Sequence, residues 1–268
     1  MKFICIRHST IIIYTILIIV ILISISFTYI ITKNTHNNDI ITEEFEDELE
    51  FICEDENNCE DSVRKELLIE QYNNKKLIAL TFDDGPSKYT EILVDEMKKR
   101  NVPVTFFILG ENASKRIDTL KFQIDAGNEI GIHSYTHKLF TKLNEDEILE
   151  QIDKTKEVIK KVYDKEITYI RVPYGSRNKK VDSSLEKANL TDILWNVDSR
   201  DWKFKNTTKT YNYVIKKVKG NDIILMHDTF KTSIEAAVKI VDKLLEEDYT
   251  FVTVSEFYET KNIIELNK

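Results

Sequence analysis

Two adjacent aspartates, Asp83 and Asp84, lie at the end of an apolar run, 77–82, that is typical of a buried strand. Gly85 and Pro86 follow, and both residue types favour a turn. Neighbouring side chains on an extended backbone point to opposite sides, so the two carboxylates are expected to serve different partners. A carboxylate pair at a strand end is suited to proton transfer and metal binding, although an isolated Asp-Asp-Gly equally well caps a turn.

The scarce residue types of the chain are concentrated in short polar segments that directly follow strand-like runs in the sequence. The chain has five His, three Pro and two Trp, and most of them fall in such segments. In order, the segments are Thr81–Ser87, His133–His137, Arg171–Gly175, Asp198–Trp202 and Leu225–Asp228. Because these residues are concentrated at strand ends, we expect them to share one site.

A pair of histidines, His133 and His137, has the spacing of metal ligands. On a helical turn, three intervening residues place both imidazoles on one face. Such a pair alone is more often a satisfied surface or core pair, but this one follows a predicted strand. Two nitrogens and one carboxylate oxygen, with open positions, are typical of a catalytic zinc-type site. The three Cys of the chain exclude a structural site built from four thiolates.

The remaining aspartate and a third histidine are candidates for proton transfer. If one of the two aspartates binds the metal, the other is free to accept a proton from the attacking water. The residues alone leave either assignment open. A hydrolase also needs a proton donor for its leaving group, and the candidate is His227, which follows the apolar strand 223–226. A lone His behind a strand is more often structural, so this assignment depends on the other segments.

Together the five segments resemble those of the polysaccharide deacetylases, carbohydrate esterase family four, from about Leu77 to Tyr258. The resemblance implies a divalent metal ion, with zinc expected and cobalt, nickel or manganese also compatible. It implies that Asp83 is the general base. The implied metal ligands are Asp84, His133 and His137.

The resemblance also gives roles to residues around the base and the acid. His227 is the expected general acid, and Asp201 pairs with it to raise its pKa. Arg171 is expected to hold and orient Asp83. The alternative for Arg171, a surface ion pair, contributes little stability and would not need the rigid Pro173 beside it.

Four residues are expected to contact the substrate. Trp202 and Leu225 are large apolar groups in polar segments, suited to stacking on a sugar and lining an acetyl pocket, with core packing an equal alternative for Leu225. Pro173 and Tyr174 are placed beside them, and the resemblance implies that the backbone N–H of Tyr174 stabilises the oxyanion. Trp195, inside a predicted strand, is expected in the core.

Short apolar strands alternate with helix-like segments behind these motifs, as in an α/β fold with a parallel sheet buried on both faces. Strands are predicted at 77–82, 104–109, 129–133, 168–172, 192–197, 222–227 and 249–254. Helices are predicted at 90–100, 114–126, 145–163, 209–218 and 233–247. About seven β/α units predict a closed or nearly closed barrel, and the resemblance implies a distorted (β/α) barrel. The five segments then meet at the C-terminal strand ends.

A membrane anchor is expected near the N-terminus. Residues 11–32 form a 22-residue uncharged run, which as a helix would be about 33 Å long against a bilayer core of about 30 Å. A cleaved signal peptide, followed by secretion, is the alternative. Lys2 and Arg7 precede the run, which predicts a cytoplasmic segment at 1–10, a single membrane pass and an extracellular catalytic domain.

Between the anchor and the domain, an acidic linker is expected at 33–74. It has eleven acidic residues and no Lys or Arg from position 43 to 61, so self-repulsion favours an extended chain. Cys53 and Cys59 lie in this linker, and a disulfide or two free thiols are equally compatible with an exported location. Residues 75–268 are then the catalytic domain.

Three hypotheses for function follow. The first is a metal-dependent hydrolase that removes N-acetyl groups from an extracellular amino-sugar polymer, and N-acetylglucosamine of peptidoglycan is the expected substrate. The second is an O-acetyl esterase acting on acetylated xylan or a similar polymer, and the third is an inactive glycan-binding protein. A net charge of −8 and the absence of a basic patch argue against nucleic-acid binding. We expect a monomer.

Overall fold

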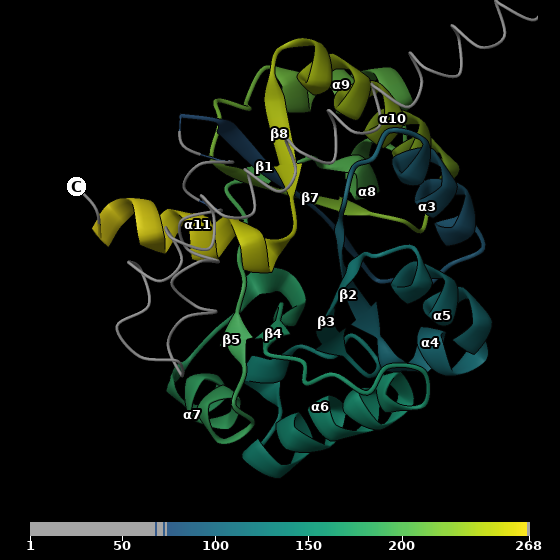
Figure 1. Ribbon diagram of the computed structural model, residues 1–268. Helices are drawn as coiled ribbons and strands as arrows, with labels where there is room; N and C mark the ends of the chain where they lie inside the picture. The colour runs from purple at the N-terminus through teal and green to yellow at the C-terminus, as the bar shows by residue number, and fades with distance from the viewer. Residues whose placement is uncertain (1–67, 69–71, 73, 267–268) are drawn as a thin grey trace, which may run out of the picture. The chain divides into compact units, whose positions relative to one another are not determined.

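Parallel strands alternate with helices in the part of the chain that the computed structural model describes, residues 68, 72 and 74–266 (Figure 1). The strands are β1 (Lys76–Asp83), β2 (Thr105–Leu109), β3 (Glu129–Ser134), β4 (Tyr169–Ile170), β5 (Thr191–Asp192), β6 (Val197–Asp198), β7 (Asp222–His227) and β8 (Tyr249–Val252). The α-helices are α3 (Thr90–Lys99), α4 (Gly110–Lys115), α5 (Ile117–Asp125), α6 (Glu145–Lys160), α7 (Lys179–Lys187), α8 (Asp201–Phe204), α9 (Thr207–Ile215), α10 (Lys231–Glu246) and α11 (Val254–Leu266). Two 3₁₀ turns, η1 (Phe140–Lys142) and η2 (Pro173–Gly175), complete the set.

The strands form one sheet in the order β5-β4-β3-β2-β1-β7-β6, and β8 also pairs with β1. All of these pairings are parallel. Strand β1 is central: β8 pairs with its first half and β2 with its end, while β7 pairs with Ile78 to Asp83. Asp83 therefore lies directly beside His227 in register, which brings two of the five segments together.

The predicted strand 192–197 is divided between the two edges of the sheet. Its first part, β5, pairs with β4, and its last part, β6, pairs with β7. Between them, Ile193 N–H donates to Ile170 O at 2.7 Å and Asn196 N–H donates to Ile223 O at 3.2 Å. One extended segment thus bridges both edges, and the expected barrel-like arrangement of about seven parallel strand segments fits the structure.

The two faces of β1 pack in different places. Ile78, Leu80 and Phe82 belong to the core cluster that packs the sheet against helices such as α3, α6 and α10. Leu77 and Ala79 belong to a second cluster with residues of β2, β7, β8 and α11, inside the barrel. A strand buried on both faces is the reason for its continuous apolar sequence.

Most predicted helices are present, with altered ends. Helix α6 begins at the predicted capping box: Asn144 Oδ1 accepts from Glu147 N–H and Glu147 Oε2 accepts from Asn144 N–H, both at 2.8 Å. The predicted helix 114–126 is broken at Arg116 into α4 and α5. Three helices, α7, α8 and α11, were not predicted.

Several N-terminal expectations lie outside the described residues: the cytoplasmic segment 1–10, the membrane span 11–32, residues 33–67 of the linker and the pair Cys53 and Cys59. No helix within the described part has both the length and the apolar character needed to cross a bilayer. The compact unit begins at Leu68, earlier than the expected residue 75. Leu68 and Tyr72 are buried in the second core cluster, so the end of the expected linker packs with the domain.

Candidate active site

The C-terminal ends of the strands surround an open pocket of about 380 Å³. It is lined by Asp83, Asp84, His133, His137, Tyr174, Trp195, Asp198, Trp202, Leu225 and His227. All five polar segments of the sequence contribute to this lining. The structure therefore brings the predicted segments together at one mouth of the barrel, where parallel strands place their carboxyl ends.

Three of the lining residues form a group that could hold a metal ion. One ligand atom each from Asp84, His133 and His137 lie within 4.8 Å of one another. Asp84 Oδ1 is 3.5 Å from the Nε2 atoms of both histidines. The same oxygen is buried and accepts no hydrogen bond from the described residues. A buried carboxylate oxygen without a donor, facing two imidazole nitrogens, fits a bound cation.

The protonation of the two histidines agrees with this fit. His133 Nδ1 lies 2.6 Å from the carbonyl oxygen of Arg171, which can only accept, so Nδ1 carries a proton and the neutral tautomer of this ring has its lone pair on Nε2. Burial and the neighbouring His133 lower the pKa of His137, which favours its neutral form. Neutral imidazole is the form that binds a metal.

The predicted helical turn between the histidines is wrong. His133 is the fifth residue of strand β3, and His137 follows the strand in a left-handed conformation with φ 57°. Ser134 Oγ accepts from His137 N–H at 2.8 Å and fixes this bend. The two rings still converge, with centroids 4.9 Å apart, because the chain reverses rather than winding into a helix.

The expectation that the aspartates point to opposite sides also fails, since both line the pocket. Asp83 ends strand β1, but Asp84 has φ 73° and is not extended. Asn112 Nδ2 donates to Asp84 O at 2.8 Å, and Leu109 N–H donates to Gly85 O at 3.0 Å. These contacts from the β2–α4 junction hold the unusual backbone. The two carboxylates do have different partners, as expected.

Asp83 is paired with a fully buried arginine. Arg171 NH1 donates to Asp83 Oδ1 at 2.8 Å and to Thr81 Oγ1 at 2.7 Å, and its Nε donates to Ile193 O at 2.8 Å. The guanidinium also lies 4.2 Å from the ring centroid of Phe107. Arg171 is therefore no surface ion pair: it links β1, β4 and the bridging segment and fixes the carboxylate of Asp83.

His227 and Asp201 form a second pair, in which Asp201 is buried and His227 is partly exposed. Asp201 Oδ1 is 2.8 Å from His227 Nδ1, and Asp201 Oδ2 accepts from His227 N–H at 2.8 Å. Burial disfavours the charged imidazole, but the hydrogen bond and charge of Asp201, with Asp83 and Asp84, outweigh it and raise the pKa of His227 to about 9. Burial likewise opposes ionisation of Asp201, yet His227 lowers its pKa. His227 Nε2 lies 4.0 Å from Asp84 Oδ2, so it faces the metal group.

The predicted substrate-contacting residues occupy different depths. Tyr174 and Trp202 line the pocket with exposed side chains, 65% and 50% of their surface respectively. Tyr174 has φ 63° and its ring meets His137 edge-on, with centroids 4.6 Å apart. Leu225 lines the pocket from within β7 and is almost fully buried. Pro173 is buried and is not among the lining residues.

Sequence reasoning missed three residues of the site. Trp195 was expected in the core. It is partly buried and packs against the second core cluster, but it also lines the pocket and lies 5.5 Å from the Arg171 guanidinium. It does so because the segment between β5 and β6 crosses the barrel instead of forming a regular strand. Asp198 also lines the pocket. The signal that could have indicated Asp198 was its place at the start of the fourth polar segment.

The third missed residue, Asp228, is buried directly behind the site. Thr90 Oγ1 donates to its Oδ2, and burial raises its pKa to about 7. A Cβ atom at position 85 would overlap the carboxylate of Asp228. The turn after the aspartate pair therefore leaves no room for a side chain at Gly85.

Comparison with known proteins agrees with this arrangement. The family model for "Polysaccharide deacetylase" matches residues 70–193. The chain is 39% identical to the peptidoglycan-N-acetylmuramic acid deacetylase PdaC of Bacillus subtilis over 189 residues, 70% of this chain and 40% of that protein. It is 35% identical to a peptidoglycan-N-acetylglucosamine deacetylase of Bacillus cereus over 192 residues, 70% of each chain.

A solved structure shows the same likeness. The structure of PdaC from Bacillus subtilis superposes with a TM-score of 0.69 at 38% identity, covering 72% of this chain and 95% of that one. The chain belongs to the polysaccharide deacetylase family, as the five segments predicted. It spans two fifths of the length of the full PdaC protein.

Proposed function

We propose that this chain is a metal-dependent hydrolase that removes N-acetyl groups from amino-sugar residues of a cell-wall polysaccharide and releases acetate. Peptidoglycan N-acetylglucosamine is the proposed substrate. The observation that carries the proposal is the meeting of three groups in one pocket: the ligand set around Asp84, the Asp83–Arg171 pair and the His227–Asp201 pair. Peptidoglycan deacetylases among the relatives support the substrate class.

Asp84, His133 and His137 would hold the metal ion, and zinc is the proposed ion because one oxygen and two nitrogens suit its catalytic sites. A divalent ion held by these residues would supply Lewis-acid activation of water and of the acetyl carbonyl. Cobalt, nickel and manganese are compatible with the same donors.

Asp83 is the proposed general base. Its carboxylate accepts a hydrogen bond from Arg171 at 2.8 Å and is 3% exposed, so it is held in one orientation at the pocket wall. From there it takes a proton from the attacking water. The Arg171 guanidinium neutralises the buried charge and keeps the carboxylate aimed at the pocket.

His227 is the proposed general acid. Its Nδ1 is engaged by Asp201, which leaves Nε2 directed toward the metal group. Because Asp201 raises the pKa of the imidazole, His227 stays protonated at neutral pH and can donate to the leaving nitrogen. Amines are poor leaving groups without such a proton, whereas esters need less help.

Tyr174, Trp202 and Leu225 are proposed to bind the sugar and its acetyl group. The exposed aromatic side chains of Tyr174 and Trp202 offer faces for a sugar ring, and Leu225 offers an apolar wall for the methyl group. The backbone N–H of Tyr174 is the proposed donor to the oxyanion of the tetrahedral intermediate. Pro173 fixes the turn that carries it.

We further propose that the domain acts outside the cytoplasmic membrane, tethered by the uncharged run at 11–32. Protease added to intact cells is expected to cut the linker within 33–67 and release the domain. A mature protein that begins after residue 32 would show instead that the run is a cleaved signal.

The function is tested by measuring acetate released from purified peptidoglycan, from N-acetylglucosamine oligomers and from acetylated xylan, with and without a chelator. The proposal expects chelator-sensitive release from the first two. Release from xylan alone would support an O-acetyl esterase. No release from any of them after metal is added back would support the inactive, glycan-binding alternative.

A further inference from the structure

The lining of the pocket includes three carboxylates, and one of them has no part in the proposed chemistry. Asp83, Asp84 and Asp198 all line the pocket, and no Lys or Arg among the described residues does. Asp83 is paired with Arg171, and Asp84 faces His133. Asp198 therefore contributes a negative charge that neither the ligand set nor the two pairs use.

Asp198 is built into the wall beside the proposed acetyl and sugar contacts. It belongs to β6, where it pairs in register with Leu225, another lining residue. The segment that follows leads to Trp202 on the same pocket. Asp198 is half-buried, so its charge is only partly screened by water.

Within the described part of the chain, no cationic side chain pairs with this carboxylate. One oxygen, Oδ1, accepts from Arg200 N–H at 2.8 Å. Among residues 74–266, no Lys, Arg or His nitrogen lies within ion-pair distance of Asp198. The neighbouring Arg200 guanidinium lies over the ring of Tyr213 instead, 5.1 Å from its centroid. The second carboxylate oxygen is left to accept from a ligand.

We propose that Asp198 determines specificity by selecting neutral amino sugars. Its second oxygen accepts a hydrogen bond from a sugar hydroxyl, and its charge disfavours a sugar that carries a carboxylate near the reacting acetyl group. This inference rests on the proposed function and narrows its substrate class. A hydroxyl is a suitable donor for an unpaired carboxylate, whereas a second carboxylate at short range is repelled.

The two amino sugars of peptidoglycan differ in this property. N-acetylglucosamine is neutral, while N-acetylmuramic acid has a lactyl carboxyl group that is ionised when bare and uncharged when amidated by a peptide. The inference therefore predicts that bare N-acetylmuramic acid is the disfavoured substrate. The amidated form is disfavoured only to the extent that its size interferes.

The test compares three tetrasaccharides of equal length with the metal-loaded protein. The first contains only N-acetylglucosamine, the second has N-acetylmuramic acid with a free lactyl carboxyl, and the third has the same sugar as its lactyl methylamide. Both kcat/KM for acetate release and equilibrium affinity are measured. The ratio of kcat/KM, or of affinity, between the methylamide and the free acid separates the effect of charge from that of size.

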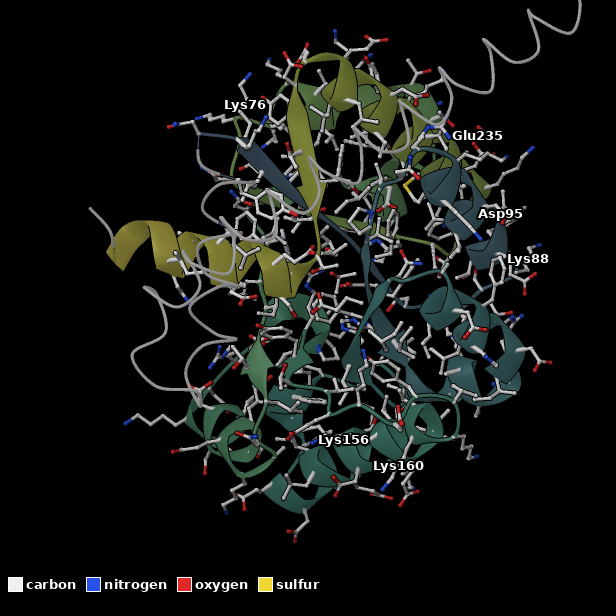
Figure 2. The ribbon with its side chains drawn as sticks, viewed as in Figure 1. Lys76, Lys88, Asp95, Lys156, Lys160 and Glu235 are labelled. Carbon is white, nitrogen blue, oxygen red and sulfur yellow. The ribbon has the colours of Figure 1, made fainter. Side chains whose placement is uncertain are left out.

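Asp198→Asn is the test variant, because the amide oxygen can still accept from Arg200 N–H. Asp95→Asn is the control, since it removes the same charge from an exposed position on α3, away from the strand ends (Figure 2). The native protein should prefer methylamide to free acid by about tenfold, as expected for one partly screened charge pair. Asp198→Asn should abolish most of that preference, and Asp95→Asn should keep it.

Two results would overturn the inference: a native protein that treats methylamide and free acid alike, or an Asp198→Asn variant that keeps the native ratio. Failure of the proposed function looks different, because none of the three oligomers would then release acetate. In that case the equilibrium affinities for the three oligomers still test the role of Asp198. Weaker binding of the free acid that disappears in Asp198→Asn supports its role, and equal binding of all three oligomers refutes it.

Discussion

The inner face of β1 changes from apolar to charged over a single strand, and this contrast separates the two ends of the barrel. Leu77 and Ala79 belong to the apolar cluster that α11 completes at the N-terminal ends of the strands. Thr81 accepts from the arginine that holds Asp83, the last residue of the strand. The base of the barrel is thus filled by apolar packing, whereas the mouth is an open pocket whose side chains are held by hydrogen bonds and paired charges.

The turns at the two ends differ in the same way. Those that lead into strands place Asn, Asp or Gly in left-handed conformations, the residue types that tolerate them best: Asn74, Asn101, Gly127, Asn189, Gly220, Asn221 and Asp248. Those that lead out of strands place other side chains there as well: Asp84, His137, Tyr174, Gly175 and Arg200. At the base, the residue types tolerate the left-handed conformation. At the mouth, several residues of less tolerant types adopt it at a conformational cost, and their side chains serve the chemistry of the site.

The largest effect expected from this comparison is at the mouth. Asp83→Asn should reduce turnover by about 10²–10⁴-fold, because the amide cannot accept the proton. It should keep stoichiometric metal, since Asp83 is outside the ligand set. Turnover and metal content of the purified variant are the measurements.

Asp84→Asn is the matched control for that variant. It should weaken metal affinity, with part of the activity recovered at high metal concentration, because an amide oxygen is a neutral and poorer ligand. His133→Ala and His137→Ala should also lose tight metal binding, while His227→Ala should keep it. The roles of base and ligand would have to be exchanged if, at saturating metal, Asp83→Asn kept native turnover and Asp84→Asn stayed inactive.

At the base, the expected effect is on stability. Phe257 of α11 is 5% exposed within the apolar cluster, so Phe257→Ala should lower the free energy of unfolding by about 3–5 kcal/mol. Turnover of the folded fraction at low temperature should stay near native.

Trp202→Ala is the counterpart at the mouth. Because the side chain is half-exposed, its removal should lower stability little but substrate affinity strongly. The contrast between base and mouth would be contradicted if denaturant titration and KM showed the same changes for Phe257→Ala and Trp202→Ala.

The strands could be predicted from sequence more fully than the turns at the mouth, whereas α11 at the base was not predicted. Apolar runs and the Asn144–Glu147 cap gave most strands and the start of α6, because these signals are local. The bend at His137 and the left-handed backbone of Asp84 were missed. Both depend on hydrogen bonds from residues elsewhere in the chain or across a turn, such as the one from Asn112 to Asp84 O.

The site residues were identified by type and order rather than by conformation. His133 and His137 converge although the helical turn expected between them does not exist. Trp195 was assigned to the core because its segment has the sequence of a strand. The structure divides that segment between two edges of the sheet, and such a division depends on how the barrel closes.

A smaller effect at the mouth is expected in the pH profile. His227 donates its proton, so kcat/KM should fall as pH rises through its pKa, which Asp201 raises. In Asp201→Asn, His227 is still buried, which lowers its pKa, but the negative charge of Asp201 that raised the pKa is gone. The alkaline limb should therefore move to lower pH by more than about one unit. An unchanged alkaline limb in this variant would mean that another group is the acid.

The smallest expected effects have opposite signs at the two ends. Asn189 precedes β5 with φ 52°, and Asn189→Ala should destabilise the fold by about 1 kcal/mol, because alanine tolerates this conformation poorly. Tyr174 has φ 63° at the mouth, and Tyr174→Asn should relieve a similar cost, reduced by the loss of the edge contact with His137. We expect Tyr174→Asn to match or exceed native stability by up to about 1 kcal/mol, while its kcat/KM falls. Denaturant unfolding of both variants, followed at equal metal loading, measures the difference. Equal destabilisation by the two substitutions would show that the mouth bears no extra conformational cost, and the positive φ of Tyr174 would then have no link to function.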